Sequence, residues 1–144
     1  MTALRQILAG AALALAFASP ALANEDEDRK NVRLLNYSLT LAEAMGQAYG
    51  VSAQCHKGAH LVPEGRLVVL DLLRGHLTAV GLSYAADAYD RGVLAMRAQY
   101  AASCEGAKEV QAKLVKDVRF YKAEVLEMLG LDETGKRIDS GEAR

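Results

Sequence analysis

Residues 41–55, LAEAMGQAYGVSAQC, carry apolar side chains at helical spacing and end in a cysteine. The pattern extends back to Val32, and its apolar positions form two adjacent rows on one broad face. One row is Leu34, Leu41, Met45, Ala48, Ser52 and Cys55, and the other is Leu35, Leu39, Ala42, Gly46 and Tyr49. The stretch therefore predicts a long helix that packs on other elements and brings Cys55 to its carboxyl end.

Three further segments have helical periodicity, and they cover residues 64–82, 84–104 and 107–129. The run LVVLDLL within the first could be a buried strand, but no second candidate strand exists to pair with it, so we expect a helix. Glycine weakens a helix interior, which predicts a kink or a break near Gly81, and Ser83 can cap the next helix. Cys104 is expected at the carboxyl end of the third helix. Glycines at positions 106 and 130 bound the fourth.

Cys55 and Cys104 are the two cysteines of the chain. In an oxidising compartment an even number of cysteines indicates a disulfide, and two allow a single intramolecular pairing. The bond would close a loop of about 50 residues and stabilise the fold by roughly 4 kcal/mol. It requires the ends of the first and third helices to meet, which an up-down-up-down arrangement with short connections provides. The sequence therefore predicts an all-α fold, an antiparallel four-helix bundle held by one disulfide.

The first 23 residues have the layout of a secretory signal peptide. Arg5 precedes an apolar run over residues 7–18, and Ala21-Leu22-Ala23 provides the small residues of a cleavage site after Ala23. The run is shorter than the roughly 20 apolar residues of a membrane-spanning helix. We therefore expect an exported, periplasmic protein that begins at Asn24 and has no stable membrane insertion after cleavage.

The remaining chain is expected to form one helical domain over residues 24–130, followed by a flexible polar tail over 131–144. Residues 24–30 are polar and mostly acidic, which predicts a frayed lead-in to the first helix. The leader carries one of the 17 basic residues and none of the 18 acidic ones, so 16 basic and 18 acidic residues remain, a net charge near −2. This balance argues against nucleic acid as a partner, because nucleic-acid binding calls for a basic stripe.

Three histidines are candidate metal ligands. His56 and His60 flank Gly58 in the stretch CHKGAH, where a pair four residues apart could bind a metal only if it lay on a helix. The stretch reads as a loop, and Cys55 is expected in the disulfide, so two exposed loop histidines are the better interpretation. His76 stands alone within an expected helix and is interpreted as a structural polar position. No metal site is assigned.

The acidic residues within the helices are interpreted as solvated surface positions. They are Glu43, Asp71, Asp87 and Asp90, with Arg91 and Arg97 close enough for surface ion pairs. The sequence has no glycine-rich phosphate loop, no G-x-S-x-G and no H-E-x-x-H. Neither catalytic residues nor a cofactor is therefore assigned, and an enzyme is not expected.

Residues 41–55 and 88–104 resemble segments of a family of small exported bacterial proteins of unassigned function. The matching positions are Glu43, Gly46, Tyr49 and Cys55 in the first segment, and Arg91, Gly92, Tyr100 and Cys104 in the second. The likeness covers about half of the chain after the leader, and the stretch between the two segments departs from it. The resemblance implies a helical fold with one disulfide, and it implies no activity.

Three hypotheses for function remain open. The first is a non-enzymatic periplasmic module that binds another envelope protein or supports the envelope. The second is an acid- or stress-protective chaperone, because known examples are small, helical, exported and disulfide-bonded. The third is a carrier of a metal or small ligand that uses His56 and His60.

Overall fold

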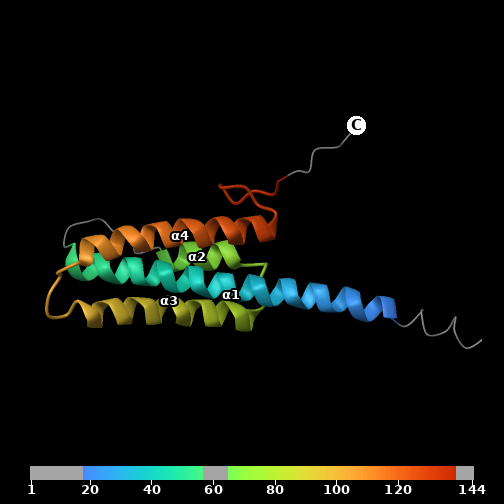
Figure 1. Cartoon of the computed structure of the whole chain (residues 1–144), viewed down its shortest axis with the longest axis horizontal. Helices are drawn as coiled ribbons and strands as arrows, with labels where there is room; N and C mark the ends of the chain where they lie inside the picture. Colours follow the sequence, from blue (N-terminus) through green and yellow to red (C-terminus); the bar gives the residue numbers. More distant parts are fainter. Residues whose placement is uncertain (1–17, 57–64, 139–144) are drawn as a thin grey trace, which may run out of the picture. The chain divides into compact units, whose positions relative to one another are not determined.

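The computed structural model describes residues 18–56 and 65–138, and the named elements in this part of the chain are four helices. They are α1 (Ala18–Cys55), α2 (Gly65–Leu73), α3 (Ala79–Gln99) and α4 (Ala107–Leu129) (Figure 1). The predicted all-α fold is confirmed over these residues. Among the helices described, none has both the length and the apolar character needed to cross a membrane.

The chain divides between Arg33 and Leu34 into two compact units. In the first unit, the side chains from Asn24 to Arg33 are all exposed. The sequence predicted a frayed lead-in over residues 24–30, but these residues are helical, because α1 begins at Ala18. Most of the predicted leader, residues 1–17, lies outside the described part of the chain.

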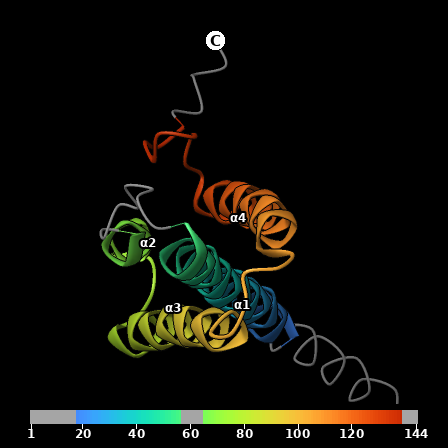
Figure 2. The same cartoon turned by 90° about the vertical axis from the view of Figure 1, so that its left-hand side faces the viewer.

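In the second unit, α1 from Leu34 onward lies between the other three helices (Figure 2). Leu41 and Ala42 are fully buried in a core cluster that includes residues of α2, α3 and α4. Val51 is fully buried in a second cluster with Tyr100 and Leu114. Burying a side chain the size of Leu or Val contributes about 1.5–3 kcal/mol, so α1 supplies much of the core. Leu41 and Ala42 belong to the predicted apolar face, whereas Val51 was not among its predicted positions.

The backbones of α1 and α3 come into close contact at two glycines, one on each helix. Gly46 of α1 faces the backbone carbonyl of Tyr89, and Gly92 of α3 faces the backbone carbonyl of Glu43. A Cβ atom at Gly92 would stand 2.8 Å from the backbone nitrogen of Gln47, well inside van der Waals contact. A side chain at either glycine would therefore push the two helices apart.

Cys55 and Cys104 form the predicted disulfide, with a Cα–Cα distance of 5.6 Å. The prediction that Cys104 ends the third helix is wrong, because α3 ends at Gln99 and Cys104 lies in the connection to α4. Tyr100 leaves the helical conformation and is 4% exposed in the second core cluster. The chain leaves the helix after that buried ring, and the irregular segment that follows reaches Cys55.

The break between α2 and α3 lies earlier than the sequence predicted. The structure places it at residues 74–78, where Gly75 adopts a positive φ of 83°, whereas Gly81 lies inside α3. Thr78, and not Ser83, caps α3, because its Oγ1 accepts a 3.1 Å hydrogen bond from the Gly81 N–H. The turn forms at Gly75 because it needs a left-handed backbone conformation, which glycine adopts without steric cost.

Both predicted boundaries of α4 are confirmed. Gly106 precedes the helix and Gly130 follows it, each with positive φ. The Gly130 N–H donates to the Glu127 carbonyl and the Leu131 N–H donates to the Leu126 carbonyl at 2.9 Å. These two hydrogen bonds form a Schellman motif, which satisfies carbonyls that the end of the helix leaves open.

Residues 131–138, which the sequence placed in a flexible tail, fold back as a turn. The Ile138 N–H donates to the Gly130 carbonyl at 2.9 Å. Asp132 Oδ1 accepts hydrogen bonds from the Thr134 hydroxyl at 2.7 Å, the Thr134 N–H at 2.9 Å and the Lys136 N–H at 3.0 Å. Asp side chains often hydrogen-bond to backbone groups a few residues further on and so form such turns. The turn leaves no periodic pattern of apolar residues in the sequence, so the analysis of helical spacing could not predict it.

We expect Gly46→Ala to lower the free energy of unfolding by roughly 2–3 kcal/mol, because the added methyl would overlap the backbone of α3. The measurement is urea unfolding of the oxidised protein followed by circular dichroism. Gly81→Ala is the matched control. Its Cβ would meet side-chain atoms and no backbone, namely Leu77 Cβ at 3.3 Å, Thr78 Oγ1 at 3.5 Å and Leu35 Cδ1 at 3.6 Å, and helix propensity would improve. Equal stability of the Gly46→Ala variant and the parent protein would contradict the close approach.

Candidate functional site

A cavity of about 420 Å³ lies against α1, α2 and α3 and is the candidate functional site. Its lining consists of Tyr49, Arg66, Tyr89, Asp90, Val93 and Leu94. Helical spacing explains the contribution of α3, because residues 89, 90, 93 and 94 are three or four positions apart and face one side. We refer to it as the tyrosine cavity.

The two tyrosine rings form the inner part of the tyrosine cavity. The Tyr49 and Tyr89 ring centroids are 6.4 Å apart with an interplanar angle of 37°. Tyr89 is 4% exposed, and a Cβ at Gly65 would lie 3.1 Å from its hydroxyl oxygen. Gly65, the first residue of α2, therefore leaves the space that the Tyr89 phenol occupies.

An ion pair closes one side of the tyrosine cavity. Arg66 Nε donates to Asp90 Oδ1 at 3.0 Å, and Arg66 Nη2 donates to Asp90 Oδ2 at 3.2 Å. Both side chains are about half exposed, so water weakens their Coulomb attraction. The main effect of the pair is geometric, because its two parallel hydrogen bonds fix the position of α2 against α3. The pair neutralises itself and leaves the tyrosine cavity without a net charge from these two groups.

The environment of Tyr89 raises the pKa of its hydroxyl above 10.0. Burial is the largest cause, followed by the proximity of Tyr49 and of the Asp90 carboxylate, while Arg66 acts in the opposite direction. The phenol is therefore neutral at physiological pH and can donate a hydrogen bond. With Val93 and Leu94 beside it, the arrangement suits an apolar or aromatic group that also offers one hydrogen-bond acceptor.

The acidic residues singled out in the sequence have different surroundings. Asp90 pairs with Arg66 and not with a neighbour on its own helix, and Asp71 pairs with Arg74 at 3.0 Å. Glu43 Oε1 accepts a 3.5 Å hydrogen bond from the Gln47 amide.

Asp87 is exposed on α3. Sequence reasoning missed the Arg66–Asp90 pair because its members are 24 positions apart and meet only when α2 packs on α3.

The histidines do not converge in the described part of the chain. His56 follows α1 directly, and its N–H donates to the Ser52 carbonyl at 2.9 Å. His60 lies outside the described residues, so the predicted loop pair cannot be placed. His76 was predicted within a helix, but it lies exposed in the turn between α2 and α3. Within residues 18–56 and 65–138, no group of three potential ligands could hold a metal ion.

A second cavity of about 380 Å³ lies against α2, α4 and the turn at 131–135. Its lining includes the charged residues Asp71, Arg74, Lys122 and Glu133, together with His76. Val68, Leu72, Leu126 and Leu131 form its apolar wall, and no tyrosine lines it, unlike the tyrosine cavity.

Large apolar side chains are exposed next to both cavities. Leu94 is 66% exposed at the tyrosine cavity, and Val68 is 54% exposed at the second cavity. Leu67 on α2, and Val80 and Tyr84 on α3, are also more than half exposed. Exposed apolar side chains beside a concave site are typical of an interaction surface.

The chain matches no family model, no curated protein and no solved structure. The resemblance of residues 41–55 and 88–104 to a family of exported proteins therefore remains an expectation.

The raised pKa of Tyr89 predicts a pH dependence of stability. Because the folded-state pKa lies above the unfolded value near 10, its contribution is fully present below pH 10 and is lost as the pH rises through the folded pKa. Between pH 8 and pH 11, Tyr89→Phe should therefore lose less free energy of unfolding than the parent protein does. Unfolding at several pH values measures this difference, with the exposed Tyr84→Phe as control. An identical pH dependence of Tyr89→Phe and the parent protein would refute the prediction.

Proposed function

We propose that this chain is an exported, non-enzymatic helical module that binds another protein of the bacterial envelope through the tyrosine cavity. Export to the periplasm is supported by the layout of residues 1–23 and by the Cys55–Cys104 bond, since disulfides persist in oxidising compartments. The observation that carries the binding proposal is the tyrosine cavity, with exposed Leu94 at its edge.

The helices of this module are proposed to form an up-down-up-down antiparallel bundle. The contacts Gly46–Tyr89 and Gly50–Val93 advance together along α1 and α3, which supports the same direction for these two helices. Tyr37 packs on Tyr121, with ring centroids 5.9 Å apart.

Farther along α1, Ser52 Oγ accepts a 2.9 Å hydrogen bond from the Gln111 amide. Later residues of α1 therefore meet earlier residues of α4, which supports opposite directions for this pair.

The occupant best suited to the tyrosine cavity is an apolar or aromatic side chain of a partner protein. Val93, Leu94 and the tyrosine rings offer apolar contact, and the neutral Tyr89 hydroxyl can donate to a backbone carbonyl beside the inserted side chain. Interfaces draw most of their binding energy from a few such anchors in partly enclosed sites. The Arg66–Asp90 pair would form part of the polar rim of the interface.

Photo-crosslinking in intact cells tests the proposal. A photoreactive amino acid at Leu94 should give one adduct of discrete mass, whereas the same probe at exposed Ala102, in the connection after α3, should give none. The adduct at Leu94 should also fall at least fivefold when Tyr49→Ala enlarges the tyrosine cavity, because the anchor would lose apolar contact.

Three outcomes would contradict the proposal. Equal labelling from Leu94 and Ala102 would show that the tyrosine cavity is not selective. An adduct of two copies of this chain would show self-association and not a second protein. A ladder of many masses would indicate broad client binding, as a chaperone would give.

A further inference from the structure

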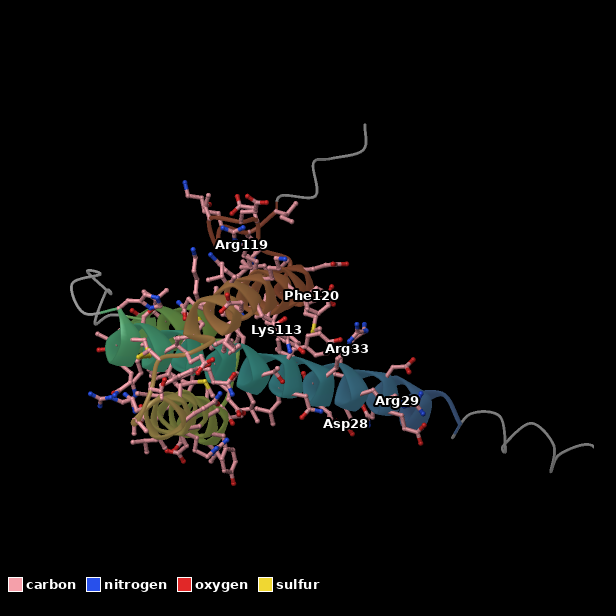
Figure 3. The ribbon with its side chains drawn as sticks, turned by 60° about the vertical axis from the view of Figure 1, so that its left-hand side comes forward. Asp28, Arg29, Arg33, Lys113, Arg119 and Phe120 are labelled. Atoms are coloured by element: carbon pink, nitrogen blue, oxygen red, sulfur yellow. A yellow bond between two sulfur atoms is a disulfide. The ribbon has the colours of Figure 1, made fainter. Side chains whose placement is uncertain are left out.

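The outward face of α4 concentrates positive charge around one exposed aromatic ring. Three basic residues of α4 lie three positions apart, and they are Lys113, Lys116 and Arg119. Phe120 lies one helical turn after Lys116. All four side chains are exposed, and Phe120 is 55% exposed. Figure 3 labels Lys113, Arg119 and Phe120, which come from this single helix. We refer to these four residues as the basic face.

The charge of this face differs from that of the whole chain. Residues 112–123 contain four basic residues and one acidic residue, Asp117, whereas the full sequence has a net charge of −1. Asp117 is half-buried at the margin of the face, and Glu109 and Glu127 lie at its two ends. Half-buried Glu124 lies one turn beyond Phe120. Between Glu109 and Glu124, four exposed basic residues and one acidic residue leave a local positive potential, which acts on an anionic surface within a Debye length.

The Phe120 ring packs against the next aromatic residue of the helix. Its ring centroid lies 5.2 Å from that of Tyr121 in an edge-to-face arrangement, and Tyr121 packs on Tyr37 of α1. The ring is therefore supported from the core side while its outer part meets solvent. An aromatic ring among lysine and arginine side chains is the composition of surfaces that lie in the interfacial zone of a bilayer.

We propose that the basic face is a peripheral binding site for an anionic phospholipid bilayer. The cations would contact lipid phosphates, and Phe120 would enter the interfacial region between the headgroups. A single helix presents a convex outer surface, which matches a plane of headgroups better than it matches an extended acidic peptide that would need a groove. The proposal is independent of the tyrosine cavity and of any protein partner.

Vesicle co-sedimentation tests the proposal with the exported, oxidised protein. The probes are vesicles of phosphatidylglycerol mixed with phosphatidylcholine, and vesicles of phosphatidylcholine alone. Binding to the anionic vesicles is expected at 0.1 M salt and should weaken strongly at 0.5 M salt, because the contacts are electrostatic. Each basic residue near an anionic surface strengthens binding about fivefold, so Lys116→Glu with Arg119→Glu should weaken it at least tenfold.

The matched control is Arg91→Glu with Arg97→Glu, which changes the net charge equally on the exposed side of α3. This control should bind within twofold of the parent protein, and circular dichroism should show the same helix content in both double variants. Absence of binding to anionic vesicles, equal binding to both vesicle types, or equal loss in the control would each overturn the proposal. Tighter binding of polyglutamate than of anionic vesicles would overturn it in favour of an acidic protein partner.

A fluorescence measurement tests the role of Phe120 separately. The sequence contains no tryptophan, so Phe120→Trp introduces a single reporter on the basic face. Its emission should shift to the blue when anionic vesicles are added, because the ring leaves water, and Tyr84→Trp on α3 should show no shift. An unshifted Phe120→Trp emission in a vesicle-bound sample would contradict insertion of the ring.

Discussion

The covalent bond between Cys55 and Cys104 is the constraint on which the second unit depends most. It joins the end of α1 to the connection that follows α3, across a sequence separation of 49 residues. Closing a loop of this length removes chain entropy from the unfolded state, which amounts to about 4 kcal/mol in the loop-entropy account. The total stability of a small domain is commonly about 5–15 kcal/mol, so this single bond carries a large share. The glycine contacts bring the backbones of α1 and α3 close together, and α1 and the connection after α3 are joined by the disulfide.

Much of the fold could be predicted from the sequence because its main signals are local. Apolar residues at helical spacing identified the helices, and Gly106 and Gly130 marked the ends of α4 correctly. The disulfide followed from the number of cysteines. The errors are also local, since the turn formed at Gly75 and not at Gly81, and Thr78 was not recognised as a cap. Gly75 and Gly81 lie in the same apolar stretch and each weakens a helix by a similar amount. Only the backbone conformation shows that the turn forms at Gly75.

The candidate site was much less predictable, because it depends on contacts between distant parts of the chain. Tyr49 was placed on the apolar face of the first helix, but nothing local shows that its ring and the ring of Tyr89 adjoin one cavity. Arg66 was not singled out at all, although it closes that cavity with Asp90. The acidic residues were interpreted as solvated, which fits half-exposed Asp90 but omits its partner on α2. Only the packing of α2 on α3 reveals that pairing.

The contribution of the disulfide is measured most directly by comparing the free energy of unfolding of the oxidised protein with that of the Cys55→Ser/Cys104→Ser double variant at the same pH. The variant is expected to keep its helix content but to lose about 4 kcal/mol, with a correspondingly lower urea midpoint. An unchanged midpoint would show that the Cys55–Cys104 bond does not supply this share of the stability.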